Sequence, residues 1–342
     1  MPVAGMVTAA PLETIATPQL WAFTVAVLAV LLGVDFAITR RPHEVRMREA
    51  IGWSIFYLAL PLLFGVFVWQ AYGTQPAVEF YTGYVVEKSL SVDNLFVFML
   101  LLSAFAVPRE LAQRVLLWGI VGALALRAVF IALGAAVLAS GTWAFLLFGG
   151  ILLVTAIKIL RDAVRGQEHE VDISSMRTIR LARRFMPVTD GYRGTHMIVR
   201  EGSRRALTPL ALAIVAVFAT DVVFAVDSVP AVYGVTEDPF LVFATNAFAL
   251  LGLRALYFVL AGALEKLRHL NHGLGIILAF IGVKLMLHWA HTVWPAVPEI
   301  PTLASLGVII VVLLTVTLTS VHANRRDERR ARAATADPLT KK

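Results

Sequence analysis

The sequence EKSLSVDN at residues 87–94 places two acids inside a run otherwise apolar enough to cross a bilayer. A second stretch, DVVFAVDS at residues 221–228, has the same order: an acid, five residues, an aspartate and a small polar residue. A carboxylate within hydrocarbon is costly and is rarely retained without a role. Two such stretches with one spacing predict a functional site inside a membrane protein.

Composition supports this interpretation. The chain has 342 residues, of which 58% are hydrophobic and 15% charged, whereas soluble domains carry about 25% charged residues. The apolar runs are continuous and about 20 residues long, as transmembrane helices require, and do not alternate as barrel strands do. No cysteine is present, so any bound metal must be held by oxygen or imidazole.

We predict an all-α polytopic membrane protein with about nine transmembrane helices. An external N-terminal tail, 1–17, precedes two leading helices within 18–72. Two three-helix repeats follow at 78–161 and 206–290, separated by a basic cytoplasmic loop at 162–205, and a last helix at 300–322 leads into a basic cytoplasmic tail at 323–342. The expected spans are 18–38, 50–72, 78–103, 113–138, 142–161, 206–230, 239–263, 271–290 and 300–322.

The distribution of basic residues predicts the orientation of the chain. Alternate connections and the C-terminal tail hold 25 of the 30 Lys and Arg residues, and the N-terminal tail and the other connections hold none. Because cytoplasmic loops carry the excess of positive charge, we expect the N-terminus outside and the C-terminus in the cytoplasm. This distribution explains the net charge of +7 without a nucleic-acid partner, and the lipid bilayer is the expected surrounding.

The remaining basic residues indicate an internal repeat. Arg127 and Arg254 lie in similar contexts, ALRAVF and GLRALY, 127 residues apart. Lys158 and Lys284 each follow a glycine by nine residues and lie 126 residues apart, while the motif acids are offset by 134. Spans three to five therefore look like a copy of spans six to eight. An odd number of spans inverts the second copy, and such inverted repeats are typical of transporters.

Helix geometry limits what the two acids of one stretch can do together. Six residues correspond to 600°, which leaves the carboxylates about 120° apart around the axis and about 9 Å apart along it. Either the acids face different sides, or the helix is broken between them. Pro230 has no N–H for the carbonyl of Val226, so we expect the break in span six.

The polar residues within the spans form an all-oxygen set of the kind that Mn²⁺, Mg²⁺ or Ca²⁺ prefers. The alternative is that the acids and bases are internal ion pairs that only hold helices together. The candidate metal ligands are Glu87, Asp93, Asn94, Asp221, Asp227 and Ser228. Asn246, Asp35 and Ser91 are candidates for a further site or gate, and Lys88, Arg127, Arg254, Lys158 and Lys284 for charge balance.

Three sequences carry a resemblance to a known family. They are EFYTGYVVEKSLSVDNLFVF at 79–98, ATDVVFAVDSVPA at 219–231 and ATNAFALLGLR at 244–254. They resemble the signatures of the TerC family of integral membrane proteins, which is similar to exporters of the LysE superfamily and was named for tellurium resistance. The resemblance implies a Mn²⁺ exporter of the bacterial inner membrane, with Glu87, Asp93, Asp221 and Asp227 as candidate ligands.

No Walker loop, Rossmann glycine pattern or HExxH motif occurs in the sequence, so neither ATP-driven pumping nor zinc proteolysis is supported. We therefore expect a secondary transporter rather than an enzyme, with no permanent cofactor and with the metal ion as substrate. Two alternatives remain open. One is a membrane scaffold or stress factor without transport, and the other is an oxyanion transporter that uses Arg127 and Arg254.

Overall fold

The structure, a computed structural model, describes residues 14–38, 47–165, 179–181, 184, 186–201, 204–260 and 270–336. Long apolar helices dominate it, because a backbone inside a bilayer must satisfy its hydrogen bonds within its own segment. The helices are α1 (Pro18–Ile38), α2 (Met47–Tyr72), α3 (Thr74–Ala104), α4 (Arg109–Ala139), α5 (Trp143–Val164), α7 (Pro209–Tyr233), α8 (Pro239–Leu251), α9 (Leu253–Leu260), α10 (Leu270–Val293) and α11 (Thr302–Ala336).

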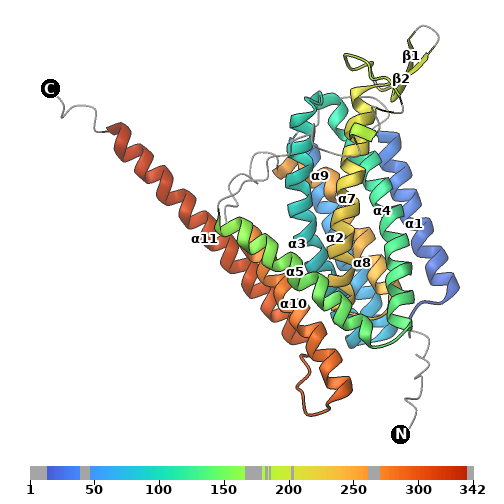
Figure 1. Cartoon of the computed structure of the whole chain (residues 1–342), viewed down its shortest axis with the longest axis vertical. Helices are drawn as coiled ribbons and strands as arrows, with labels where there is room; N and C mark the ends of the chain where they lie inside the picture. The colour runs from blue at the N-terminus through green and yellow to red at the C-terminus, as the bar shows by residue number, and fades with distance from the viewer. Residues whose placement is uncertain are drawn as a thin grey trace.

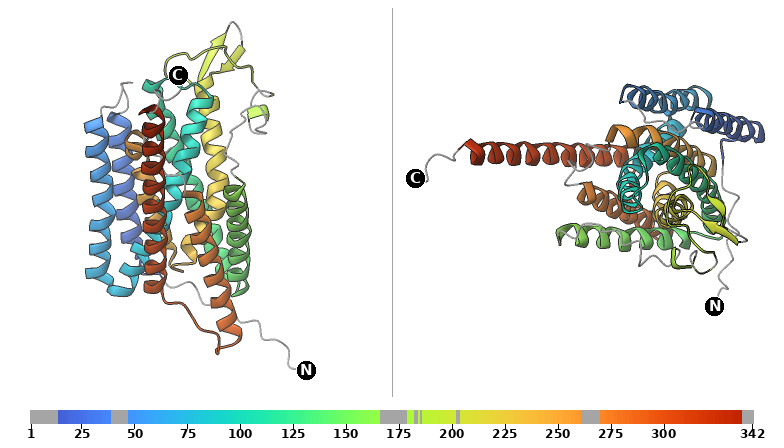
Figure 2. Two further views of the ribbon diagram at one scale, coloured as in Figure 1. Left: turned by 90° about the vertical axis from the view of Figure 1, so that its left-hand side faces the viewer. Right: turned by 90° about the horizontal axis from the view of Figure 1, so that it is seen from above.

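The central helices come from both halves of the chain. α4 packs along α7, α3 packs along α8, and α5 lies against α10. α1 and α2 cover one side of this centre, and α11 contacts α3 and α10 and projects away from the bundle (Figures 1 and 2). The packing therefore brings the motif of residues 87–94 on α3 and the motif of residues 221–228 on α7 into one helix cluster.

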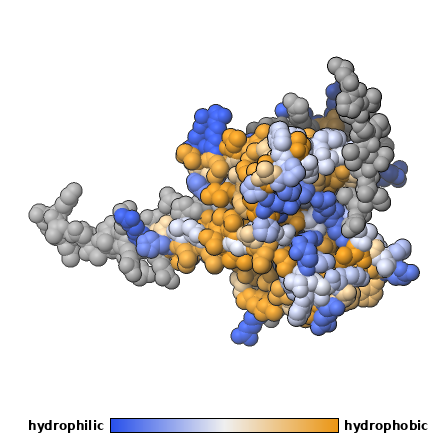
Figure 3. All heavy atoms as spheres, turned by 90° about the horizontal axis from the view of Figure 1, so that it is seen from below, coloured by the Kyte–Doolittle hydropathy of each residue, from blue (hydrophilic) through white to orange (hydrophobic). Residues whose placement is uncertain are grey.

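The prediction of an all-α polytopic membrane protein is confirmed. Within the described residues, eight segments are long and apolar enough to span a membrane, the sixth of them combining α8 and α9. The predicted span that is not among these eight is the third, which corresponds to α3; this helix is 31 residues long but carries Glu79, Glu87, Lys88 and Asp93. Viewed from below, the molecule shows extensive hydrophobic surface around a smaller group of polar residues (Figure 3). A lipid-embedded bundle with a polar end has this appearance.

The prediction of a break in span six is wrong. α7 runs without interruption from Pro209 to Tyr233, and Pro230 lies inside it. A proline so close to a helix end removes one hydrogen bond, and the helix needs few more before it terminates. The discontinuity lies instead in span seven, where α8 ends at Leu251 and α9 begins at Leu253.

Two other elements differ from the prediction. The loop at 162–205 contributes to an antiparallel hairpin, β1 (Ile198–Glu201) with β2 (Arg204–Leu207), in which Ile198 pairs with Leu207. The tail expected from residue 323 is helical as far as Ala336, as a continuation of α11. Both segments are polar and lie outside the apolar spans, so a hydropathy pattern contains no signal for their structure.

The crossing of α5 and α10 leads to a test with an unusually close control. A Cβ atom on Gly149 would lie 2.8 Å from the backbone oxygen of Gly282, whereas a Cβ atom on Gly150 would meet nothing within 4 Å. We expect Gly149→Ala to lower the free energy of unfolding by about 1–3 kcal/mol, as overpacking does. Gly150→Ala should be neutral or raise it by about 0.5–1 kcal/mol, since alanine favours a helix.

Thermal unfolding of both variants in one detergent measures the difference. Equal melting temperatures for Gly149→Ala and Gly150→Ala would show that α5 and α10 do not make this contact.

Candidate ion-binding site

The side chain of Arg127 is the centre of a fully buried polar cluster. It extends from α4 and is 0% exposed. Its Nη1 forms an ion pair with Glu87 Oε1 on α3 and lies 2.8 Å from Asn246 Oδ1 on α8. Its Nη2 lies 3.6 Å from Asp221 Oδ1 on α7. One guanidinium therefore joins the first acids of both motifs, and four helices meet around it.

Some buried acceptor oxygens of the cluster receive no hydrogen bond from the described residues. With its amide oriented to suit both neighbours, Asn94 donates to the Leu90 carbonyl at 3.1 Å and accepts from Arg127 Nη2 at 3.3 Å. Because buried polar atoms are normally hydrogen-bonded, the remaining oxygens are available as acceptors for a further donor or as ligands for a cation. The buried oxygens without a hydrogen-bond partner in the described structure include Glu87 Oε2, both carboxylate oxygens of Asp221, Ser91 Oγ and Ser228 Oγ.

The two acids of the second motif face different neighbours. Asp221 is 1% exposed and faces Arg127, whereas Asp227 accepts a hydrogen bond of 2.7 Å from Thr155 Oγ1 on α5. An unbroken helix produces this divergence, as the six-residue spacing requires. In the first motif Glu87 belongs to the central cluster, and the side chain of Asp93 lies outside the described structure.

The six proposed ligands therefore do not all lie together. Among the described residues, no group of three or more His, Asp or Glu side chains has an arrangement that could hold a metal ion. A site built on Glu87 and Asp221 would have to add amide and hydroxyl oxygens from Asn94, Ser91 or Ser228. Amide, hydroxyl and carboxylate oxygens are all acceptable ligands for hard divalent cations.

Arg254, the counterpart of Arg127 in the proposed repeat, lies in a different ion pair. Its Nη2 is 2.7 Å from Asp35 Oδ1 on α1, and its Nη1 is 3.2 Å from Gln113 Oε1 on α4. Asp35 is 1% exposed, so its carboxylate lies inside the bundle. The pair connects α9 to α1, which lies outside both repeats.

The three lysines proposed for charge balance have three different surroundings. Lys88 Nζ donates to the Ala249 carbonyl at 3.2 Å, so it bonds to the end of α8. Lys158 is exposed on α5 and is close enough to act electrostatically on Asp227. Lys284 lines a pocket at one end of the bundle.

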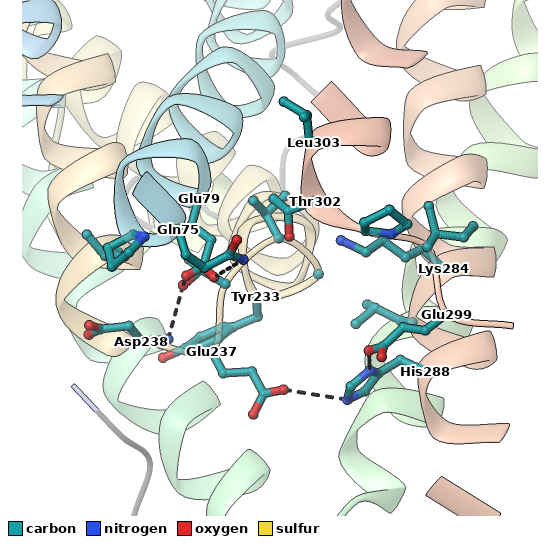
Figure 4. A pocket seen from close by; sticks show the side chains of 18 of the residues that line it. Gln75, Glu79, Tyr233, Glu237, Asp238, Lys284, His288, Glu299, Thr302 and Leu303 are labelled. Atoms are coloured by element: carbon teal, nitrogen blue, oxygen red, sulfur yellow. Dashed lines mark hydrogen bonds and ion pairs between the residues drawn. The ribbon is translucent and has the colours of Figure 1, made fainter. Parts of the chain in front are cut away.

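That pocket, here called the vestibule, was not predicted from the sequence. It has a volume of about 950 Å³ and is lined by Glu79, Glu237, Lys284, His288 and Glu299, among others (Figure 4). His288 Nδ1 lies 2.6 Å from Glu299 Oε1, and His288 Nε2 lies 3.5 Å from Glu237 Oε1. The vestibule is acidic overall, which favours cations near its mouth.

The vestibule and the central cluster share helices α3 and α7. Glu79 and Glu87 are eight residues apart on α3, or about 12 Å along the axis. Thr236, in the connection from α7 to α8, donates to Glu79 Oε2 at 2.7 Å. Tyr233, at the end of α7, lines the vestibule and donates to the Ile131 carbonyl at 2.8 Å. The central cluster is closed to solvent in this conformation, since Glu87 is 0% exposed.

Glu237 gives a prediction for the pH dependence of stability. Partial desolvation raises the pKa of the half-exposed Glu237 carboxyl above its ordinary value of 4.5; the Glu79 and Glu299 carboxylates add to the rise, and His288 opposes it. A carboxyl group with a raised pKa contributes stability that is complete below its unfolded pKa and is lost as pH rises through the folded value. The melting temperature of the wild-type protein should therefore fall as pH rises above 4.5. The melting temperature of Glu237→Gln should fall less over the same range.

Melting curves in detergent between about pH 4 and about pH 8 cover this window. A Glu237→Gln profile that runs parallel to the wild-type profile would contradict the assignment.

Comparison with known proteins places these motifs among related membrane proteins. Residues 72–328 match the family described as "Integral membrane protein TerC family". The chain is 44% identical over 273 residues to "Uncharacterized membrane protein STKORF319" of Myxococcus xanthus, with 80% of this chain and 84% of that protein covered. It is 37% identical over 328 residues to "Putative membrane-bound redox modulator Alx" of Escherichia coli K12, with 93% and 99% covered.

A mycobacterial protein has a similar degree of sequence identity to the chain. The chain is 42% identical over 277 residues to "Uncharacterized membrane protein Rv2723" of Mycobacterium tuberculosis, with 81% of this chain and 70% of that protein covered. No solved structure matches the chain.

Proposed function

Because the chain belongs to the TerC family of integral membrane proteins, we propose that it is a secondary transporter that exports a divalent cation, Mn²⁺, from the bacterial cytoplasm. The observation that best supports this proposal is the meeting of Glu87 and Asp221 at one buried guanidinium. These acids begin the two motifs and come from helices that are far apart in the sequence. Buried ionisable groups shared by several membrane helices typically mark an ion pathway.

The donor chemistry of the cluster supports a divalent cation. Glu87 and Asp221 provide two negative charges, Asn94 and Ser91 add buried neutral oxygens on α3, and Ser228 adds one on α7. Manganese and magnesium accept such ligands, and with no cysteine in the chain softer thiolate sites are excluded. The preference for manganese and the outward direction come from the family resemblance.

The remaining polar groups suggest a path for the ion. In this proposal the N-terminus is external, so the vestibule opens to the outside and attracts the released cation. Asp227, beside Thr155, provides a second carboxylate away from the central cluster and serves a gate or proton path. The transported ion undergoes no chemical conversion, and the energy comes from an ion gradient or the membrane potential.

The geometry gives less support to other functions. An oxyanion site would need available cationic groups, but Arg127 contacts Glu87 and Asp221, and Arg254 contacts Asp35. The relative Alx is named as a redox modulator, yet thiol–disulfide exchange requires cysteine, which this chain lacks. If the protein is a scaffold without transport activity, no protein-dependent ion flux is expected.

Efflux from proteoliposomes tests the proposal. Vesicles with purified protein and internal Mn²⁺ should lose the metal faster than protein-free vesicles, and imposing a membrane potential or a pH gradient identifies the driving force. Protein vesicles that release and exchange Mn²⁺, Mg²⁺ and Ca²⁺ no faster than protein-free ones would rule out the transport function. Tellurite uptake in the same vesicles would favour the oxyanion alternative.

A further inference from the structure

We propose that Arg127 is an internal counter-cation, which occupies the site in place of the transported metal when the site is empty. The inference rests on the transport function proposed above and concerns how the empty transporter changes conformation. It assigns to Arg127 a role in the return step of the cycle, separate from metal binding itself.

The position of the guanidinium supports this role. Arg127 contacts Glu87 and Asp221, the two acids proposed to bind the metal, and all three side chains are at most 1% exposed. Two carboxylates cannot remain charged and unpaired in such a place without a large cost. Metal and guanidinium therefore compete for the same oxygens, and each can replace the other.

The charges agree with a replacement mechanism. A divalent cation neutralises two carboxylates without help, so the guanidinium is not needed when the metal is bound. In the empty site Arg127 neutralises one carboxylate and stays close to the other. Asn246 Oδ1, 2.8 Å from Nη1, is a neutral partner that the guanidinium can keep when Glu87 turns to a metal ion.

Such a device has a functional consequence. A transporter whose empty site is compensated for one of its two negative charges can change conformation without a bound ion, and can therefore carry out net export. Without the compensation, the transporter would change conformation only when loaded, and would exchange metal for metal across the membrane without net movement.

Arg254 provides the matched control. It occupies the equivalent position in the second half but pairs with Asp35 of α1, a residue outside both acidic motifs. Arg254→Gln removes a buried guanidinium without changing the partners of Glu87 and Asp221. A loss that is only structural should therefore affect net export and exchange by the same factor.

The experiment compares two fluxes of radioactive Mn²⁺ in proteoliposomes: net efflux into metal-free medium, and exchange against external Mn²⁺. For Arg127→Gln we expect net efflux to fall at least about tenfold while exchange stays within about threefold of wild type. The Mn²⁺ dissociation constant should decrease about tenfold, equivalent to about 1.4 kcal/mol, because a competitor has been removed. Arg127→Lys retains a positive charge and should restore part of the net efflux.

The possible outcomes are distinct. Weaker Mn²⁺ binding by Arg127→Gln, or equal loss of net efflux and exchange, would mean that Arg127 only positions Glu87, and the inference would fail while the transport function stands. If Arg127→Gln does not fold, Arg127→Lys decides: its shorter side chain should bind Mn²⁺ more tightly than wild type, and unchanged or weaker binding overturns the inference. Wild-type vesicles that show neither flux remove the transport function and the inference with it.

Discussion

Replacing Glu87 by glutamine will lower the initial rate of Mn²⁺ efflux from proteoliposomes by more than about a hundredfold, a loss equivalent to about 2.7 kcal/mol. The substitution keeps the size of the side chain and removes one of two negative charges from a site with 0% exposure. The amide carries no charge and cannot neutralise a divalent cation. Among the described residues, Asp221 is then the remaining carboxylate of the cluster. Asp221→Asn should have an effect of the same size.

Asp227→Asn is the comparison on the same helix. Asp227 faces Thr155 and lies away from Arg127, so its neutralisation should reduce efflux less than about tenfold and leave Mn²⁺ affinity unchanged, as titration calorimetry can measure. Wild-type flux in Glu87→Gln and Asp221→Asn would exclude the central cluster as the binding site. A loss of Mn²⁺ affinity in Asp227→Asn alone would move the binding site toward α5.

Asp35→Asn should cause the largest loss of stability, about 3–5 kcal/mol, because it leaves a buried guanidinium without its carboxylate. Arg254 is 4% exposed and its Nη2 lies 2.7 Å from Asp35 Oδ1. Gln113, its other hydrogen-bond partner among the described residues, lies at 3.2 Å, is neutral and cannot replace the lost charge. Thermal unfolding of the purified variant in detergent measures the effect.

The double variant Asp35→Asn with Arg254→Gln tests the cause of this loss. In Asp35→Asn the Arg254 guanidinium is buried without a compensating charge. The double variant lacks this guanidinium, so it should be more stable than Asp35→Asn alone. The coupling between the two substitutions should exceed about 1 kcal/mol in a double-mutant cycle. Additive effects would show that Asp35 and Arg254 do not interact in the folded protein.

The sequence predicts much of this architecture because the main constraints are local. Each apolar span is visible as a continuous run, and two motifs with one spacing point to Glu87 and Asp221 before any contact is known. The divergence of Asp221 and Asp227 also follows from helix geometry alone. Whether the two halves form an inverted repeat stays a prediction, although α4 packs on α7 as α3 packs on α8.

The remaining features depend on contacts between distant segments. Asp35 and Arg254 are 219 residues apart, and no pattern in either span identifies the other as its partner. The vestibule combines Glu79 of α3 with His288 of α10 and two connecting segments, so its acids appear in the sequence as isolated polar residues near span ends. Pro230 misled the prediction because a proline signals a break only when enough helix follows it.

The interruption between α8 and α9 divides one span into two parts with different attachments. Lys88 of α3 donates a hydrogen bond to the Ala249 carbonyl at the end of α8. Its positive charge also interacts favourably with the negative end of the helix dipole. Arg254, two residues beyond Gly252, fastens α9 to α1 and α4. We therefore expect α3 and α8 to move as one rigid body and α9 to remain with α1 and α4, with Gly252 as the pivot. The moving unit would then cross the boundary between the two sequence halves.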